Sequence, residues 1–318
     1  MSSGPKKIQP ADLSRVSRYS QKRRSHKTEI ELFGQPMENT AKNEFFDSLP
    51  KFLKANDLKE FINEVAIARK AQKPFHLLLG AHSIKVGLSP ILIDLIKSEI
   101  VTGFSINCAG VIHDLELAFF GQTSEDVQLG LEDGSFGMVE ETGDLFAEVC
   151  NMAHKQKIGL GEATGRIINE KKAPNRKISL FATAAELELP ATVHAAIGTD
   201  TVAQHPTFDG AKVGEASYVD FRILVSICKE IDRGGVVANI GSAVLLPEVF
   251  LKALTVARNL SKGKSKLTTA NFDMIMHYRP MVNVVTRPTK NAGKGFSFVG
   301  HHEIMIPLLA WGLKNRLA

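Results

Sequence analysis

The segment FHLLLGAHSIKVGLSPILIDLI (75–96) decides the predicted fold. Phe75–Leu79 is a short hydrophobic run, typical of a strand that is buried on both faces. A glycine-containing loop (80–87) follows it, and Ser89-Pro90 is typical of the start of a helix. Apolar residues then recur at helical spacing, as Leu88, Ile91, Leu92, Leu95 and Ile96. The segment therefore predicts a strand, a loop and a helix in succession.

The same alternation continues to the end of the chain. Further strands are predicted at 103–108, 191–197, 235–240, 272–276, 282–286 and 296–299. Helices are predicted at 56–70, 115–120, 145–156, 165–171, 178–187 and 217–231, and from Pro247 onward. Strands that alternate with helices and are apolar on both faces predict an α/β fold. The expected architecture is a Rossmann-like parallel sheet with helices on both faces.

The first residues differ in charge from the rest of the chain. The 318-residue sequence carries a net charge of +5, and eight lysines and arginines crowd into its first thirty residues. Only Asp12 and Glu29 oppose them there. We expect a basic arm and extension (1–45) and a single Rossmann-like domain (46–318). A solvated tail, or packing on a neighbouring subunit, is favoured for the arm over nucleic acid binding, because no RNA-binding aromatic motif accompanies it.

Composition narrows the class of protein. Hydrophobic residues make up 44% of the chain, as in an ordinary globular protein. No apolar run approaches the ~18–20 residues that span a bilayer, and the N-terminus lacks the apolar core of a secretory signal. Three widely spaced cysteines argue against a disulfide framework. The expected location is the cytoplasm, with a small-molecule substrate as partner and no membrane.

Histidines recur directly after predicted strands. His82, His113 and His301 occupy such positions, and ligands of open α/β sheets bind at the carboxyl ends of strands. Further polar residues fall at or just past strand ends: Asp114, Asp200, His302 and Glu303. Such a group suits acid–base catalysis near neutral pH and equally suits a divalent metal. His194, by contrast, lies inside a strand and is expected in the core.

Two glycine-containing segments are weak candidates for phosphate binding. The fingerprint G-x-G-x-x-G is missing after the first strand. GLGEATG (159–165) follows a helix and a basic stretch, so a helix boundary is the favoured interpretation. RPTKNAGKGF (287–296) lacks the GK[ST] of a Walker loop and is interpreted as a solvated turn.

Five segments in order resemble the deoxyhypusine synthase family. They are GAHSIKVG (80–87), NCAGVIHDLELAF (107–119), GEATGRIINEKKAPNRKISLFATAAELELPATVHAAIGTD (161–200), VVANIGSAVLLPEVFLKA (236–253) and FVGHHEIMIPLL (298–309). The similarity covers roughly residues 45–310. It implies a deoxyhypusine-synthase-like fold, NAD as cofactor, a homotetramer, an imine on an active-site lysine and transfer of an aminobutyl group from a polyamine.

The resemblance also assigns roles to residues. The chain is shorter near the family's catalytic lysine, which leaves Lys290 and Lys294 as nearby amines; Lys294 is the better candidate for imine formation, and the strand-end residues His113 and His301 are expected as further catalytic residues. The NAD site is expected to comprise His82, Ser83, Gly87, Asn107, Ala109, Gly110, Asp200, Gly241 and Ser242.

The chain departs from the family pattern at several of these places. Ile112-His113 replaces an acidic pair, His301-His302 replaces Asp-Ala, and the Trp-Gly-Lys segment is not recognisable. The predicted function is therefore an NAD-binding transferase for an amine or polyamine-related substrate with altered specificity. Two alternatives stay open: a metal-dependent hydrolase that uses His82, His113, Asp114 and His301, and a non-catalytic binding protein.

Overall fold

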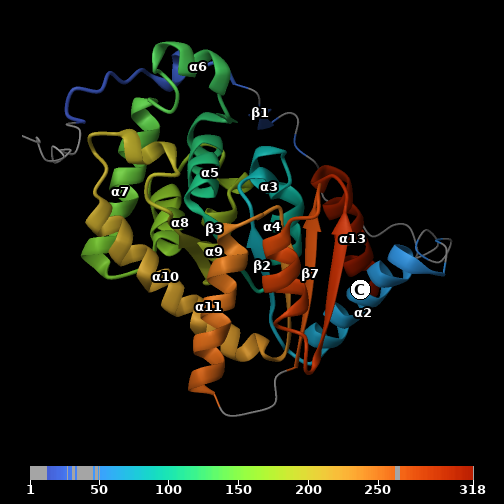
Figure 1. Cartoon of the computed structure of the whole chain (residues 1–318). Helices are drawn as coiled ribbons and strands as arrows, with labels where there is room; N and C mark the ends of the chain where they lie inside the picture. Colours follow the sequence, from blue (N-terminus) through green and yellow to red (C-terminus); the bar gives the residue numbers. More distant parts are fainter. Residues whose placement is uncertain are drawn as a thin grey trace, which may run out of the picture.

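A computed structural model describes residues 13–26, 28–30, 33, 46, 49, 51–261 and 266–317. Its centre is a six-stranded sheet in which every neighbouring pair of strands is parallel (Figure 1). In spatial order the strands are β5 (Ala191–His194), β3 (Gly103–Asn107), β2 (Phe75–Leu79), β6 (Arg233–Ile240), β7 (Lys266–Asp273) and β8 (Gly293–Val299). The predicted α/β fold with a parallel sheet is confirmed.

The strand order creates a switch point in the middle of the sheet. The chain begins the sheet at β2, adds β3 and β5 on one side, and returns to add β6, β7 and β8 on the other. Connections therefore leave β2 and β6 in opposite directions, and the carboxyl ends of these two strands form the switch point at which ligands of open α/β sheets bind; this position is called the crevice below. All six strands end at one edge, called here the carboxyl edge, where the arrowheads of Figure 1 point.

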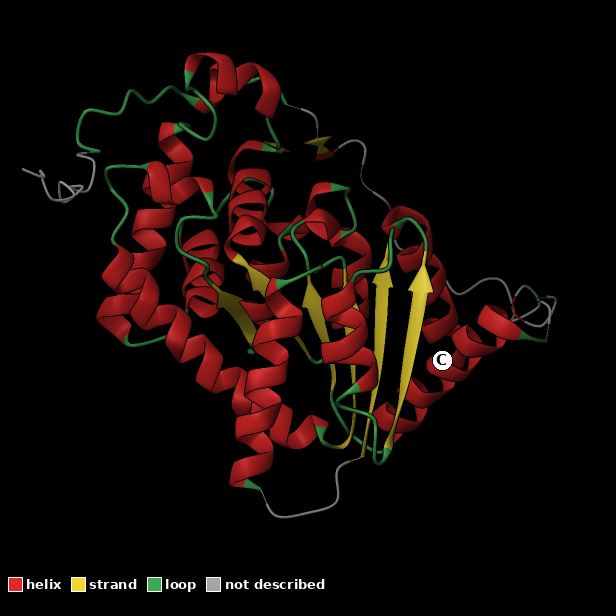
Figure 2. Ribbon diagram, viewed as in Figure 1, coloured by secondary structure: helices red, strands yellow, loops and turns green. Residues whose placement is uncertain are grey.

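Helices cover both faces of the sheet (Figure 2). On one face Phe61 packs against Phe75, Phe272, Phe296 and Phe298 of the strands. That face is covered by α2 (Leu53–Lys70), α4 (Ser89–Lys97) and α13 (His302–Leu317). The other face is covered by α10 (Gly210–Ile231) and α11 (Leu245–Leu260), which bury a second apolar cluster against the sheet.

Other helices, all between β2 and β5 in the chain, pack around that half of the sheet, where Phe181 contacts Phe104 of β3. They are α3 (His82–Lys85), α5 (Cys108–Phe120), α6 (Val127–Asp133), α7 (Glu140–Gln156), α8 (Leu160–Glu170) and α9 (Leu180–Glu186). GLGEATG (159–165) contains the start of α8, as its interpretation as a helix boundary requires. A small antiparallel pair, β1 (Thr28–Glu29) and β4 (Gln122–Thr123), ties the N-terminal segment to the end of α5.

The predicted strand at 282–286 is wrong. After the short helix α12 (Tyr278–Pro280), residues Met281–Thr286 form a π-helix, η5. The valine-rich run favours a strand locally, but Val284 is fully buried in the apolar cluster of α10 and α11. Asn283 donates a hydrogen bond to Glu248 of α11 at 2.9 Å. Tertiary packing thus overrides strand propensity.

The strand predicted at 272–276 is displaced. β7 begins at Lys266 and ends at Asp273, so only its last two residues were predicted. Polar residues in the middle of β7 hide its hydrophobic pattern: Thr268, Thr269 and Asn271 are all buried. Among the described helices, none combines the length and the apolar character needed to span a membrane.

Candidate functional site at the carboxyl edge

Two glycines bring the ends of β2 and β6 into close contact. A Cβ atom added to Gly80 would lie 2.1 Å from the carbonyl oxygen of Gly241, so no side chain fits there. Gly241 has φ +69°, a left-handed conformation that favours glycine. The Gly80 amide donates to the Ile240 carbonyl at 2.8 Å. These contacts form the floor of the crevice at the switch point.

Two histidines border this crevice. His82 opens α3 and is half-buried, and its ring centroid lies 5.6 Å from that of His302. His302 opens α13, is buried, and packs against Gly241, with its Nε2 3.2 Å from the Phe272 carbonyl oxygen. Burial, followed by repulsion from His302, lowers the pKa of His82. The structure therefore places a neutral imidazole at the mouth of the crevice.

The side chain of His301, one of the predicted catalytic residues, does not face this crevice, whereas that of His302 does. The His301 side chain is 65% exposed and lies 3.6 Å from Glu303. The two histidines are adjacent, and at the start of a helix successive side chains point in different directions. The sequence thus located the histidine pair but not which member turns inward.

The predicted NAD residues fall into two groups. At the crevice, Ser83 donates to the Gly80 carbonyl at 2.8 Å, and the Ser242 hydroxyl accepts from the Leu246 amide at 3.2 Å. Both serines stabilise the turns that carry the crevice. Gly87 has φ +78° and its Cα packs against Phe33, which indicates a structural position behind α3.

The second group gathers at the start of α5, one strand away. The Asn107 side chain accepts from the Gly110 amide at 3.3 Å and thereby caps the helix. Asp200 lies beside Ala109, Thr199 and Cys108, and burial raises its pKa to about 6. One helix N-terminal donor, the Gly110 amide, is therefore already paired within the protein.

Asp114 points away from the predicted site. Its buried carboxylate accepts from the Leu180 amide at 3.0 Å and from Ser179, and so caps α9. His113 instead meets Thr123 through Nδ1 at 2.7 Å. Searching the described residues finds no group of three His, Cys, Asp or Glu side chains placed to hold a metal ion. The four ligands of the metal alternative are not brought together.

The prediction that Lys294 is a desolvated nucleophile is wrong. It is the second residue of β8, five residues or about 16 Å from the carboxyl end of that strand. Its side chain is 49% exposed and pairs with Glu60 at 2.7 Å and Glu64 at 2.6 Å. Hydrogen bonds to these two carboxylates raise the pKa of Lys294. The lysine is thus protonated, and it lies at the opposite edge of the sheet.

A cavity of about 200 Å³ lies next to the crevice. Its walls include Lys85 of α3, His113 of α5 and Asp200. Burial lowers the pKa of His113 to about 4, so this imidazole is neutral at pH 7. Since α3 carries both His82 and Lys85, the crevice and the cavity share one short helix. The cavity of about 200 Å³ is called the carboxyl-edge cavity below.

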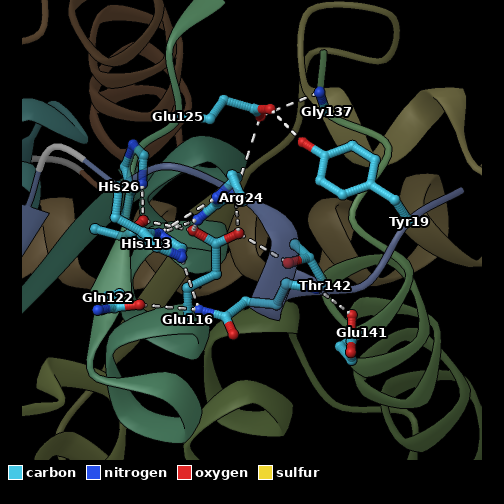
Figure 3. A network of polar contacts seen from close by, with 12 residues as sticks. Tyr19, Arg24, His26, His113, Glu116, Gln122, Glu125, Gly137, Glu141 and Thr142 are labelled. Carbon is cyan, nitrogen blue, oxygen red and sulfur yellow. Dashed lines mark hydrogen bonds and ion pairs between the residues drawn. The ribbon is translucent and has the colours of Figure 1, made fainter. Parts of the chain in front are cut away.

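The N-terminal arm supplies one wall of this cavity, which the sequence did not predict. Arg24 reaches Glu116 of α5 with two hydrogen bonds of 2.8 and 2.9 Å, and their side chains are 5% and 1% exposed (Figure 3). Glu116 also accepts from Thr142 at 2.8 Å and from Thr123. Burial acts to raise the pKa of Glu116, but the hydrogen bond and charge of Arg24 outweigh it and lower this pKa.

The arm is therefore neither a solvated tail over 13–26 nor packed only on another subunit. Further contacts hold it to the same domain: the Tyr19 hydroxyl donates to Glu125 at 3.0 Å, and the Gln21 amide donates to Glu141 at 2.8 Å. One signal for this was present in the sequence. Glu116 interrupts the apolar run 115–120, and a buried acid requires a partner.

Comparison with solved structures places the fold among known proteins, whereas no protein-family model and no curated protein matches the sequence. The LOR/SDH-like protein of Methanococcus maripaludis S2 superposes with a TM-score of 0.52 at 12% identity, over 88% of this chain and 73% of that one. AgrE in its ternary complex with ornithine and NAD+ gives 0.50 at 13% identity, over 82% of this chain and 32% of AgrE.

The chain shares their fold. It spans about a third of AgrE, and identities of 12–13% extend the likeness no further than the fold. A deoxyhypusine-synthase-like protein from Entamoeba histolytica covers 86% of this chain and 96% of its own length, with a TM-score of 0.48 at 10% identity. That score adds no argument about function.

Proposed function

We propose that this protein is an NAD-binding enzyme that acts on a small substrate carrying an amine. The observation that carries the proposal is the switch point between β2 and β6, where the turns at Gly80 and Gly241 pack too closely for a side chain. A dinucleotide binds at such a switch point in Rossmann-like sheets. AgrE, which shares the fold, is known in complex with ornithine and NAD+.

Unpaired polar atoms at the same edge support a bound ligand. His302 Nδ1 and Asp273 Oδ2 are buried and have no hydrogen-bond partner within the described part of the chain. Buried polar groups of folded proteins are ordinarily paired, so an unpaired set next to a crevice suits a polar ligand. Exposed apolar side chains beside it, Val244, Met274 and Ile275, offer surface to aromatic rings.

The residues at the crevice suit removal of a hydride from an amine-bearing carbon and of a proton from its nitrogen. NAD, when bound, supplies the hydride acceptor. His82 is neutral and half-buried, and so can accept the proton that the amine releases. The backbone contact between Gly80 and Gly241 holds the two turns together, and the buried His302 ring packs against Gly241.

We also propose the more specific properties that the family resemblance implies. They comprise transfer of an aminobutyl-type fragment, a polyamine-related donor, a homotetramer and a cytoplasmic location. Transfer through an imine requires a lysine at the carboxyl edge, and Lys294 does not lie there.

Calorimetric titration with NAD tests the proposal. The unmodified protein is expected to bind NAD, and His82→Leu is expected to bind at least about fivefold more weakly, a loss of ~1 kcal/mol. His154→Leu, a change at an exposed histidine that contacts Glu215, is the matched control and should leave affinity unchanged. Absence of binding to the unmodified protein up to ~1 mM NAD or NADP would overturn the proposal.

A further inference from the structure

The charges that line the carboxyl-edge cavity are unevenly paired. Arg24 and Glu116 neutralise each other through their hydrogen bonds. Lys85 also lines the cavity, and the described residues offer it no hydrogen bond or ion pair. The cavity thus presents one ammonium group whose charge has no partner within the described part of the protein.

Two carboxylates of the same cavity lack a strong cationic partner. Glu125 accepts from the Tyr19 hydroxyl and the Gly137 amide, each at 3.0 Å, while Arg24 stays 3.9 Å away (Figure 3). Asp200 also lines the cavity, beside the uncharged Ala109, Thr199 and Cys108, and no cation of the described residues forms an ion pair with it. A positively charged group of a ligand would be favoured next to Glu125 and Asp200, and a negatively charged group would be favoured next to Lys85.

We infer that the carboxyl-edge cavity binds a small α-amino acid. Its carboxylate pairs with Lys85, and its ammonium group with Asp200 and Glu125. This rests on the proposed function and deepens it, because it turns an unspecified amine into an amino acid. The helix α3 carries Lys85 at the cavity and His82 at the crevice, so one short helix connects the amino-acid site to the proposed NAD site.

The size of the cavity agrees with this ligand class. About 200 Å³ is below the ~300–1,000 Å³ of pockets for drug-sized ligands. At ~30 Å³ per water molecule it corresponds to about seven waters, enough for an amino acid with a short side chain. A volume of this size suits the amino acid, and the dinucleotide is assigned to the crevice instead.

Calorimetric titration of the full chain with matched ligands tests the inference. L-Ornithine and L-alanine carry both charges, putrescine is ornithine without its carboxylate, and pentanoate lacks the amines. At least one of the two amino acids is expected to bind at least about tenfold more tightly than putrescine and pentanoate, a difference of ~1.4 kcal/mol. This comparison uses unmodified protein and does not depend on any variant folding.

A substitution then locates the carboxylate. Lys85→Met is expected to weaken amino-acid binding at least about tenfold and to leave NAD affinity within about twofold. Lys97→Met, at an exposed position in the last turn of α4, is the matched control and should change neither.

Three outcomes overturn the inference: neither amino acid binds at millimolar concentration, pentanoate or putrescine binds as tightly as the amino acids, or Lys85→Met binds them as the unmodified protein does. NAD binding is measured separately on the same samples. Loss of the amino-acid result with NAD binding intact removes this inference alone, whereas absence of NAD binding removes the proposed function.

Discussion

At the scale of single residues, Arg24 and Glu116 show how one contact defines the site. They are 92 residues apart in sequence, yet both side chains are almost fully buried. A buried ion pair is weak evidence for net stability, but breaking it is costly because one charge stays buried alone.

Arg24→Met is therefore expected to destabilise the protein by about 3–5 kcal/mol. Urea unfolding followed by circular dichroism measures this change. Arg15→Met, at an exposed position of the same arm, is the control and should unfold like the unmodified protein. Adding Glu116→Gln to Arg24→Met should restore part of the loss, and equal stability of all these proteins would contradict the buried-pair interpretation.

A second residue makes stability depend on pH. His194 is buried in β5, as predicted, and burial lowers its pKa from 6.5 to about 4. Between these values the unfolded chain takes up a proton at His194 that the folded chain does not. The stability associated with a neutral His194 is therefore present above about pH 6.5 and is lost as the pH falls toward 4.

We expect the free energy of unfolding to fall by up to ~3 kcal/mol more in the unmodified protein than in His194→Gln between pH 6.5 and 4. Unfolding both proteins in urea at pH 7.5, 6 and 5 gives the difference directly. Comparing the pair cancels the opposing contributions of Asp114, Asp200 and Asp220, whose pKa values burial raises. A difference that stays constant with pH would rule out this role for His194.

At the scale of elements, the turns after β2 and β6 are the most constrained part of the site. Gly80→Ala would place a methyl group 2.1 Å from the Gly241 carbonyl oxygen, which is backbone and cannot rotate away. The two strand ends must separate to accommodate it, and the crevice changes shape.

Gly80→Ala is accordingly expected to lose at least about tenfold in NAD affinity and ~1–3 kcal/mol in stability, the usual cost of inserting volume into a packed site. Gly214→Ala is the control: it lies in α10 with open space around it and should stabilise the protein by ~0.5–1 kcal/mol. Calorimetry and urea unfolding test both. Full NAD affinity in Gly80→Ala would show that the nucleotide binds elsewhere.

Elements also show where prediction from sequence succeeds. β2, a short and mostly apolar run followed by a glycine, was predicted to the residue, because both its faces are buried. β7 and η5 were not, since Thr269 and Asn271 are polar yet buried, and valines 284–285 are β-branched yet helical. In both cases the deciding contacts come from distant segments that local patterns do not contain.

At the scale of the whole molecule, the parts of the site that local sequence patterns determine were predicted, and the parts that depend on distant contacts were not. Parallel strands follow from the alternation of strands and helices, so the carboxyl edge and the histidines near it were predictable. The choice of His302 over His301, the opposite-edge position of Lys294 and the contribution of Arg24 all depend on packing across the molecule.

Deleting residues 1–26 tests whether the arm stabilises the domain. The deletion removes the partners of Glu116, Glu125 and Glu141, and is expected to destabilise the protein more than Arg24→Met does. Thermal unfolding of the two variants side by side makes the comparison. A deletion protein as stable as the full chain would mean that the arm contributes nothing to the fold.

Arg24 lines the carboxyl-edge cavity and also anchors the arm, so the two are thermodynamically linked. Any ligand that binds the cavity only while the arm is docked must tighten the docking by the same factor by which docking tightens the ligand. Amide hydrogens near the docked arm, such as those of Gln21 and Glu140, would then exchange with solvent more slowly as ligand is added. The arm would in this way report occupancy of a cavity that it helps to enclose.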